Sequence, residues 1–233
     1  GRMRLYTNPG FRAKFKAESV VGAKNANAGW ANRTVVSYYP PDPLLEEQPL
    51  TAVAEAQGVD PVDLVLDMSL ETELTARFRL AFLNHDEAEV EELITDANTI
   101  VTLSDAGAHA SQLCDACYST HLLSHWVREK GAMSLESAVH TLTQRPAELM
   151  GITDRGLLAG GRPADVVVFD PDTVGASPLR RVQDFPGGAD RLVSDAIGVE
   201  AVIVNGQVLR RGGDDQIDAE GDLPGRVLRG GHA

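Results

Sequence analysis

Residues 78–105, FRLAFLNHDEAEVEELITDANTIVTLSD, decide the fold expected for this chain. The apolar run Phe78 to Asn84 predicts a strand, Glu87 to Thr95 with its acidic first turn predicts a helix, and Thr99 to Leu103 predicts a second strand. Strands that alternate with helices are typical of βαβ units, in which the strands are parallel. The stretch therefore predicts an α/β fold with a parallel sheet.

Upstream of this stretch, the sequence predicts a short strand and two helices. Thr34 to Tyr38 is an apolar run of strand length, and the proline-rich segment 39–49 that follows it should be a connection. Helices are expected over Ala52 to Gln57 and from Pro61 to Met68, where proline occupies the favoured first turn.

Downstream, helices are expected over Ser111 to Glu129 and Ser134 to Leu142, with a break near Pro146. The character then changes, because Ala164 to Phe169 and Val199 to Leu209 are short β-branched runs. Within the second run, the dipeptide Asn205-Gly206 is a strong signal for a two-residue hairpin turn.

The chain should therefore divide into two parts, an α/β part over residues 1–156 and a β-rich part over residues 157–233. At 233 residues, with 43% hydrophobic and 24% charged residues, it has an ordinary globular composition. No apolar run approaches the roughly 20 residues that span a bilayer, so no membrane partner is expected.

The net charge of −13 argues against a nucleic-acid partner, since such proteins neutralise phosphates with clusters of lysine and arginine. Two cysteines cannot form a disulfide framework in a chain of this length, and the first residues are not an apolar signal segment. We expect a cytoplasmic protein whose partner is a small molecule.

Asp105 is the first candidate for chemistry. It follows the predicted strand Thr99 to Leu103 and precedes Ala106-Gly107-Ala108, and in α/β barrels reactive groups lie at the carboxyl ends of strands. A carboxylate there can bind a metal ion or transfer a proton, although aspartate in a loop also often caps its own turn. His109, four residues further on, could face the same cleft or simply satisfy the loop.

Cys114, Cys117, His121 and His125 superficially resemble a zinc-finger ligand set. Zinc fingers place roughly twelve residues between the two pairs, whereas only three separate Cys117 from His121. On one helix the four side chains would spread over about 16 Å, too far to share one ion. We expect a packed helix face, with a Cys-x-x-Cys redox pair as the alternative. The common cofactor-binding and hydrolase motifs are absent from the sequence.

Nine short stretches together carry a resemblance to a known family. They are residues 103–109 (LSDAGAH), 114–116 (CDA), 125–128 (HWVR), 142–148 (LTQRPAE), 154–156 (DRG), 161–170 (GRPADVVVFD), 184–188 (DFPGG), 202–206 (VIVNG) and 224–226 (PGR). In this combination they resemble the N-acyl-D-amino-acid deacylases of the amidohydrolase superfamily. The resemblance covers the chain from about Leu50 to its end, and the combination of motifs is specific.

This resemblance implies a distorted (β/α)8 barrel flanked by a small β-sandwich, with a zinc site at the barrel mouth. Asp105 would touch the metal and act as general base and acid, so that water attacks the amide and an N-acyl-D-amino acid is cleaved. His109 is a candidate for substrate binding. Asp165 would be structural.

The chain also departs from the family. The His-x-His pair, the bridging residue and the two further histidines of such sites are absent, and a barrel of roughly 250 residues does not fit in this length. We therefore expect the C-terminal part of an amidohydrolase barrel followed by its sandwich. Zinc would belong to the full-length parent, and this chain alone would be inactive. Assembly as a homo-oligomer stays open. The alternatives are a non-catalytic binding or oligomerisation domain and a small metal or thiol protein built on Cys114 and Cys117.

Overall fold

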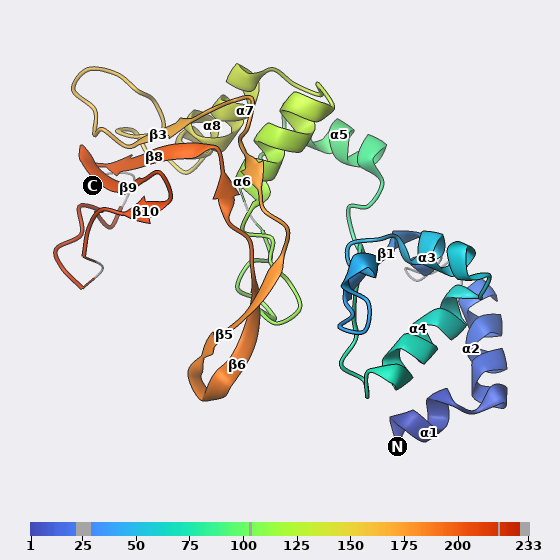
Figure 1. Cartoon of the computed structure of the whole chain (residues 1–233). Helices are drawn as coiled ribbons and strands as arrows, with labels where there is room; N and C mark the ends of the chain where they lie inside the picture. The colour runs from blue at the N-terminus through green and yellow to red at the C-terminus, as the bar shows by residue number, and fades with distance from the viewer. Residues whose placement is uncertain (22–28, 103, 219, 229–233) are drawn as a thin grey trace. The chain divides into compact units, whose positions relative to one another are not determined.

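The computed structural model describes residues 1–21, 29–102, 104–218 and 220–228 (Figure 1). The chain forms two compact units, unit 1 (Gly1–Val90) and unit 2 (Glu91–Ala233). The division expected at residues 156 and 157 concerns the barrel and sandwich of the family, and it stays a prediction. No helix in the described residues is long and apolar enough to cross a membrane.

In its described residues, unit 1 is mainly helical and contains one strand pair. Its elements are α1 (Arg2–Tyr6), α2 (Pro9–Val21), η1 (Trp30–Arg33), β1 (Thr34–Tyr38), η2 (Pro43–Leu45), α3 (Leu50–Gln57), α4 (Pro61–Glu71) and β2 (Arg77–Leu80). The strand at β1 and the helices at α3 and α4 confirm the predictions from sequence. Helix α4 begins at Pro61 because Asp60 caps it, accepting a hydrogen bond from the backbone N–H of Val62 at 2.9 Å.

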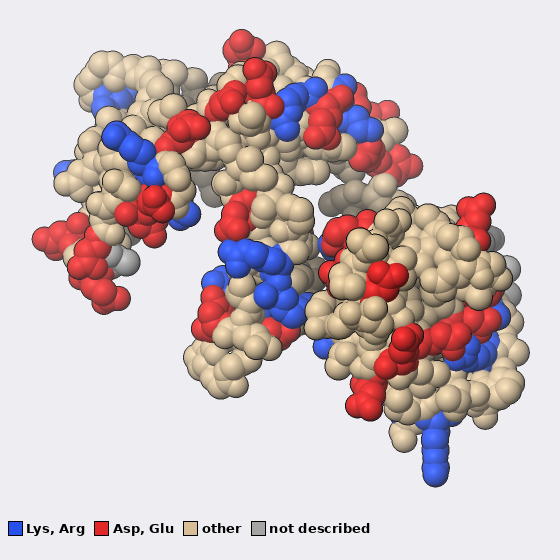
Figure 2. All heavy atoms as spheres, in the orientation of Figure 1, with Lys and Arg blue, Asp and Glu red and all other residues tan. Residues whose placement is uncertain are grey.

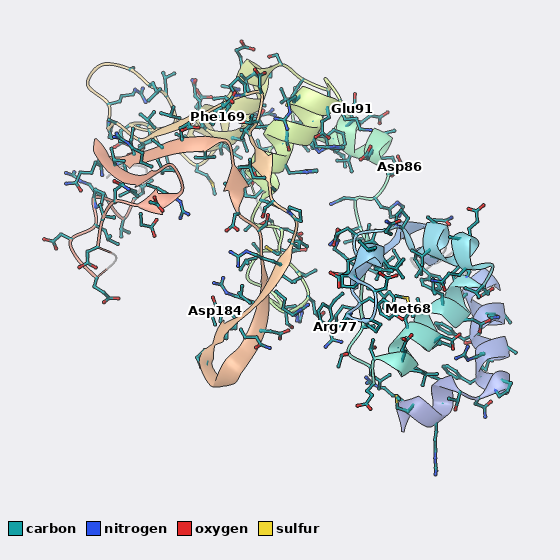
Figure 3. All side chains as sticks on the ribbon, viewed as in Figure 1. Met68, Arg77, Asp86, Glu91, Phe169 and Asp184 are labelled. Atoms are coloured by element: carbon teal, nitrogen blue, oxygen red, sulfur yellow. The ribbon has the colours of Figure 1, made fainter. Side chains whose placement is uncertain are left out.

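The core of unit 1 lies between β1 and the two helices α3 and α4. It consists of Val36, Tyr39, Leu50, Val53, Ala54, Leu64, Met68 and Ala76, with Trp30 and Phe78 packed against it. The buried residues of α4 form two pairs, Val62 with Leu66 and Leu64 with Met68, and the members of each pair lie one turn apart. The two pairs lie on opposite sides of the helix, and Leu64 and Met68 belong to this core. Figure 3 shows Met68 among the side chains of this unit.

The expected parallel βαβ arrangement over residues 78–103 is wrong in the described structure. The first strand ends at Leu80 and pairs antiparallel with β1, with Thr34 opposite Leu80. Helix α5 (Glu87–Thr95) follows as predicted, but residues 99–102 are not a strand, and Leu103, the last residue of the predicted strand, lies outside the described residues. An apolar run forms a strand only when another strand offers hydrogen bonds, and the described residues place none beside residues 99–102.

The helices of unit 2 differ from the predictions at their ends. They are α6 (Tyr118–His121), the π-helix η3 (Leu122–Glu129), α7 (Leu135–Leu142) and α8 (Gln144–Leu149). The helix expected from Ser111 begins only at Tyr118, so residues 111–117 lie in a loop. The helical break falls at Thr143 and not at Pro146, because proline is tolerated in the first turn of α8, where its missing N–H is not needed.

The β-rich character expected after Leu157 is confirmed. A four-stranded antiparallel sheet has the order β10 (Asp214–Asp215), β9 (Gln207–Arg211), β8 (Val199–Val204) and β3 (Val166–Phe169). The predicted turn connects β8 to β9, with positive φ angles of 47° at Asn205 and 80° at Gly206. Two smaller pairs join β4 (Gly175–Ala176) to β7 (Ala196–Ile197), and β5 (Arg180–Phe185) to β6 (Ala189–Val193).

Candidate functional site

Asp105 lies in an irregular loop of unit 2, residues 104–117, that precedes α6. The backbone N–H of Ala108 donates to the Asp105 carbonyl at 3.1 Å, and that of Ala106 donates to the Ser104 hydroxyl at 3.3 Å. The Asp105 side chain is exposed, and within the described part of the chain its carboxylate has no hydrogen bond or ion pair. The turn is thus formed by the backbone and by Ser104, and the Asp105 carboxylate is available to a ligand.

His109 lies at the end of the same turn and is also exposed. Its φ angle of 48° is in the left-handed region, which residues other than glycine adopt rarely. Its carbonyl accepts hydrogen bonds from the backbone N–H groups of Gln112 at 2.7 Å and Leu113 at 3.1 Å. The structure therefore places both predicted site residues in one surface turn, without a hydrogen bond between their side chains.

The hairpin formed by β5 and β6, which the sequence did not suggest as part of the site, is bonded to this loop. The backbone N–H of Leu192 on β6 donates to the Ala110 carbonyl at 2.9 Å. The guanidinium of Arg181 on β5 donates to the Ser111 carbonyl at 3.1 Å and also pairs with Asp190. Asp184, labelled in Figure 3, pairs with Arg191 at 2.7 Å further along the same hairpin.

The described residues do not make up a metal site. No group of three or more His, Cys, Asp or Glu side chains in these residues could hold an ion. Protein zinc sites use three or four side-chain ligands. Asp105 alone supplies one carboxylate, so the residues present do not by themselves fit zinc.

Cys114 and Cys117 are free thiols in the loop, ahead of α6. The single stripe expected for them along one helix with the histidines is therefore wrong, because their part of the chain is not helical. Burial raises the pKa of the Cys117 thiol, whereas redox-active cysteines have a lowered pKa. The structure thus offers no support for a reactive thiol at Cys117.

His121 and His125 lie one helical turn apart, with ring centroids 4.9 Å apart and an angle of 14° between the ring planes. Stacked rings present their faces to each other, whereas metal ligands direct ring nitrogens at a common point. His125 Nδ1 instead lies 2.9 Å from a carboxylate oxygen of Glu129, and this hydrogen bond lowers the pKa of Glu129. The pair is part of the helix surface.

Asp165 is structural, as the resemblance implied. Its carboxylate pairs with Arg155 and accepts a hydrogen bond from the backbone N–H of Asn205 at 2.8 Å. These contacts connect the loop before β3 to the turn between β8 and β9. A cavity of about 340 Å³ beside them is lined by Asp154, Arg155, Pro163, Ala164, Asn205 and Arg226.

Comparisons with known proteins agree with these motifs. The model of the amidohydrolase family matches residues 16–210. The chain is 31% identical over 178 residues to a D-aminoacylase of Alcaligenes xylosoxydans xylosoxydans, covering 76% of this chain and 33% of that protein. It is 33% identical over 188 residues to an N-acyl-D-aspartate deacylase of the same organism, covering 77% and 34%.

Two solved structures are also similar. A D-aminoacylase crystal structure is 25% identical, with a TM-score of 0.44, over 80% of this chain and 36% of that one. An N-acyl-D-glutamate deacylase from Bordetella bronchiseptica, complexed with zinc and a phosphonate inhibitor, is 26% identical, with a TM-score of 0.42, over 85% and 38%. The chain spans about a third of the length of the curated relatives it matches. Because the family model matches most of its residues, this chain belongs to the amidohydrolase family.

Proposed function

We propose that this chain is a segment of a metal-dependent amide hydrolase that removes the acyl group from N-acyl-D-amino acids. Support comes from its 31% identity with a D-aminoacylase and its 33% identity with an N-acyl-D-aspartate deacylase. Since the segment spans about a third of those proteins, the activity belongs to the longer protein. The described residues offer one candidate metal ligand, so we expect the segment alone to be inactive.

The Asp105 carboxylate is the observation that carries this proposal. It is exposed and has no partner in the described residues, while the turn around it is held by backbone hydrogen bonds. Asp165, in contrast, is already engaged by the guanidinium of Arg155 and the backbone N–H of Asn205. Asp105 is thus free to accept a proton from the attacking water and to return it to the leaving amine.

Zinc is the metal we propose for the longer protein, with Asp105 as one ligand. A related N-acyl-D-glutamate deacylase is complexed with zinc. The described residues do not complete such a site, so its other ligands must come from elsewhere in the longer protein. A bound metal would polarise the amide and the water, and Asp105 would move the proton.

His109 is the residue we propose for substrate binding. It is exposed in the same turn as Asp105, and the turn directs its backbone into the left-handed region. An imidazole can donate a hydrogen bond to the carboxylate of an N-acyl amino acid. Such a contact would hold the substrate while Asp105 acts at its amide.

We further propose that residues 1–156 belong to the barrel and residues 157–233 to the sandwich of a longer, cytoplasmic protein. We propose a homo-oligomer as the assembly of that longer protein. The two free cysteines are consistent with a reducing compartment. The net charge of −13 supports a small-molecule substrate and not a nucleic acid.

The test is hydrolysis of N-acetyl-D-amino acids by the longer protein, followed as release of free amine, with the L-isomers as substrate controls. Replacement of Asp105 by Asn should lower kcat by about 10²- to 10⁴-fold, because the variant cannot accept the proton. Asp115→Asn is the matched control, since Asp115 is exposed in the same loop. Full activity of Asp105→Asn, or an equal loss in Asp115→Asn, would refute the role of Asp105.

A further inference from the structure

We propose that the hairpin of β5 and β6 positions the Asp105 loop, and that Arg181 is the positioning residue. The inference rests on the proposed function for the role of Asp105. The structural part, that Arg181 fixes the place of the loop, can be tested without any measurement of hydrolysis.

The two bonds from hairpin to loop come from one cross-strand pair. Arg181 and Leu192 lie opposite each other in the antiparallel register of β5 and β6. Leu192 donates its backbone N–H to the carbonyl of Ala110, and Arg181 donates its side chain to the carbonyl of Ser111. Consecutive carbonyls of the loop are therefore held by neighbouring donors of the hairpin.

These carbonyls lie directly after the candidate site residues. Ala110 follows His109, and Ser111 is six residues after Asp105. In the described part of residues 104–113, the other hydrogen bonds join groups two to four residues apart, as in Ala108 to Asp105 and Leu113 to His109. Local turns fix the shape of a loop but not its place in the unit. The hairpin bonds supply that place.

Arg181 is itself held in orientation. It pairs with Asp190 on the opposite strand, and its side chain is 25% exposed. A guanidinium presents several donors in a rigid planar fork, so one group can bond a carboxylate and a carbonyl together. Asp190 thus directs Arg181 toward the Ser111 carbonyl.

The hairpin is stiffened by further contacts. Arg191 pairs with Asp184 and lies 5.5 Å above the ring of Phe185. The turn of the hairpin is Pro186–Gly188, where Gly187 and Gly188 have φ angles of 73° and 72° that favour glycine. Figure 2 shows oppositely charged atoms next to each other on this hairpin. A hairpin stiffened in this way fixes the position of the Asp105 loop more firmly than a flexible segment would.

The experiment compares Arg181→Gln with Arg180→Gln in the longer protein. Arg180 is the matched control because it is the adjacent arginine on β5 and pairs with Asp195 at 3.1 Å, whereas among the described residues it makes no hydrogen bond to the loop. Hydrogen exchange is measured at the amides of Leu192, Gln112 and Leu113. Arg181→Gln should raise their exchange rates on the order of tenfold, whereas Arg180→Gln should leave them unchanged.

Activity provides the second readout. Arg181→Gln should lower kcat by about tenfold with a smaller change in KM, because the loop with Asp105 is less well placed. Asp190→Asn removes only the residue that orients Arg181. It should also raise loop exchange and lower kcat, but by less than Arg181→Gln does. Arg181→Lys should recover part of the loss, since lysine keeps the pairing with Asp190.

Unchanged loop exchange in Arg181→Gln, or an equal rise in Arg180→Gln, would overturn the proposal. The outcome is separable from that of the proposed function. If Asp105→Asn is fully active while loop exchange responds to Arg181→Gln as expected, the deacylase mechanism fails and the positioning of the loop stands. If Arg181→Gln fails to fold, Asp190→Asn replaces it as the test. Faster loop exchange and a lower kcat in Asp190→Asn would support the proposal, and no change in either would overturn it.

Discussion

Units 1 and 2 are stabilised in different ways. In unit 1 the described core includes large apolar side chains that are almost completely buried, among them Val36, Leu50, Leu64 and Met68. In unit 2 the buried apolar residues among those described are Leu122, Leu123, Trp126, Ala138, Ala147 and Val174, and the four-stranded sheet contributes none of them. Val167 and Val168 on β3 are 55% and 45% exposed.

This difference indicates that burial of apolar surface holds unit 1 together, whereas turns, ion pairs and backbone ladders contribute more in unit 2. Burial stabilises a fold by about 25 cal/mol per Å² of apolar surface, whereas an exposed ion pair contributes less than about 1 kcal/mol. Each unit also contains one of the chain's two tryptophans, Trp30 and Trp126. In the variant Trp126→Phe only Trp30 remains, so its fluorescence reports on unit 1. In Trp30→Phe only Trp126 remains, so its fluorescence reports on unit 2.

The largest effect is expected for Leu50→Ala in unit 1. Leu50 is fully buried, so the change should lower the free energy of unfolding by about 2–5 kcal/mol through lost burial and a cavity. Urea unfolding followed at Trp30 measures it. Leu44→Ala is the control, because Leu44 is 83% exposed and its change should cost less than about 0.5 kcal/mol. An equal loss of unfolding free energy measured at Trp126 would mean that the two units unfold together. The two units would then not be stabilised separately.

A smaller effect, in unit 2, is expected for Gly198→Ala. Gly198 has a φ angle of 68°, and a Cβ atom there would lie 2.6 Å from the backbone nitrogen of Val174. The strain and the clash should together cost about 2–4 kcal/mol, measured by urea unfolding at Trp126. In Gly161→Ala, where φ is 85° but no atom lies within 4 Å, only the backbone strain of about 1–2 kcal/mol should remain. Equal costs in the two variants would show that the close approach to Val174 does not matter.

The smallest effect is a pH dependence in unit 1. Hydrogen bonds from Lys16 and Arg12 hold the pKa of Asp63 below its ordinary value of 3.8. A lowered native pKa means that the contribution of Asp63 is present above pH 4 and is lost as the pH falls through the native pKa. Because these side chains are partly exposed, the contribution should be less than about 1 kcal/mol.

Unfolding free energies at pH 7 and near pH 3, followed at Trp30, measure the contribution of Asp63. Asp63→Asn should be the less stable protein at pH 7 and should lose less stability on acidification. The same pH dependence in the variant and in the parent would assign the acid sensitivity of unit 1 to other groups.

The elements predicted correctly from sequence depend on local signals. Pro61 after an N-capping Asp60 specifies the start of α4, and Asn205-Gly206 specifies a hairpin turn with its own backbone angles. The strand expected over Thr99 to Leu103 is wrong for the described residues 99–102, because a strand requires a partner, which no short run of sequence supplies. The helix expected from Ser111 was wrong because the turns around His109 and the bonds to the hairpin keep residues 111–117 in a loop.

The candidate site was predictable only in part. Asp105 and His109 were found because they flank the small residues 106–108 after an apolar run. The contact of Arg181 with Ser111 joins residues 70 positions apart, and no local pattern marks it. The carbonyl that Arg181 bonds is a backbone group, so the type of residue at position 111 gives no signal either.

The hairpin of β5 and β6 carries no net charge, which limits how it acts on ions that diffuse near the protein. Residues 180–195 contain three arginines and three aspartates, and each arginine pairs with one aspartate, so this arm is electrically neutral in a chain of net charge −13. A neutral set of closely spaced pairs has a field that decays faster than that of a net charge. The long-range attraction of cations toward this protein must therefore originate in its other segments, and the hairpin acts on its surroundings only at contact range.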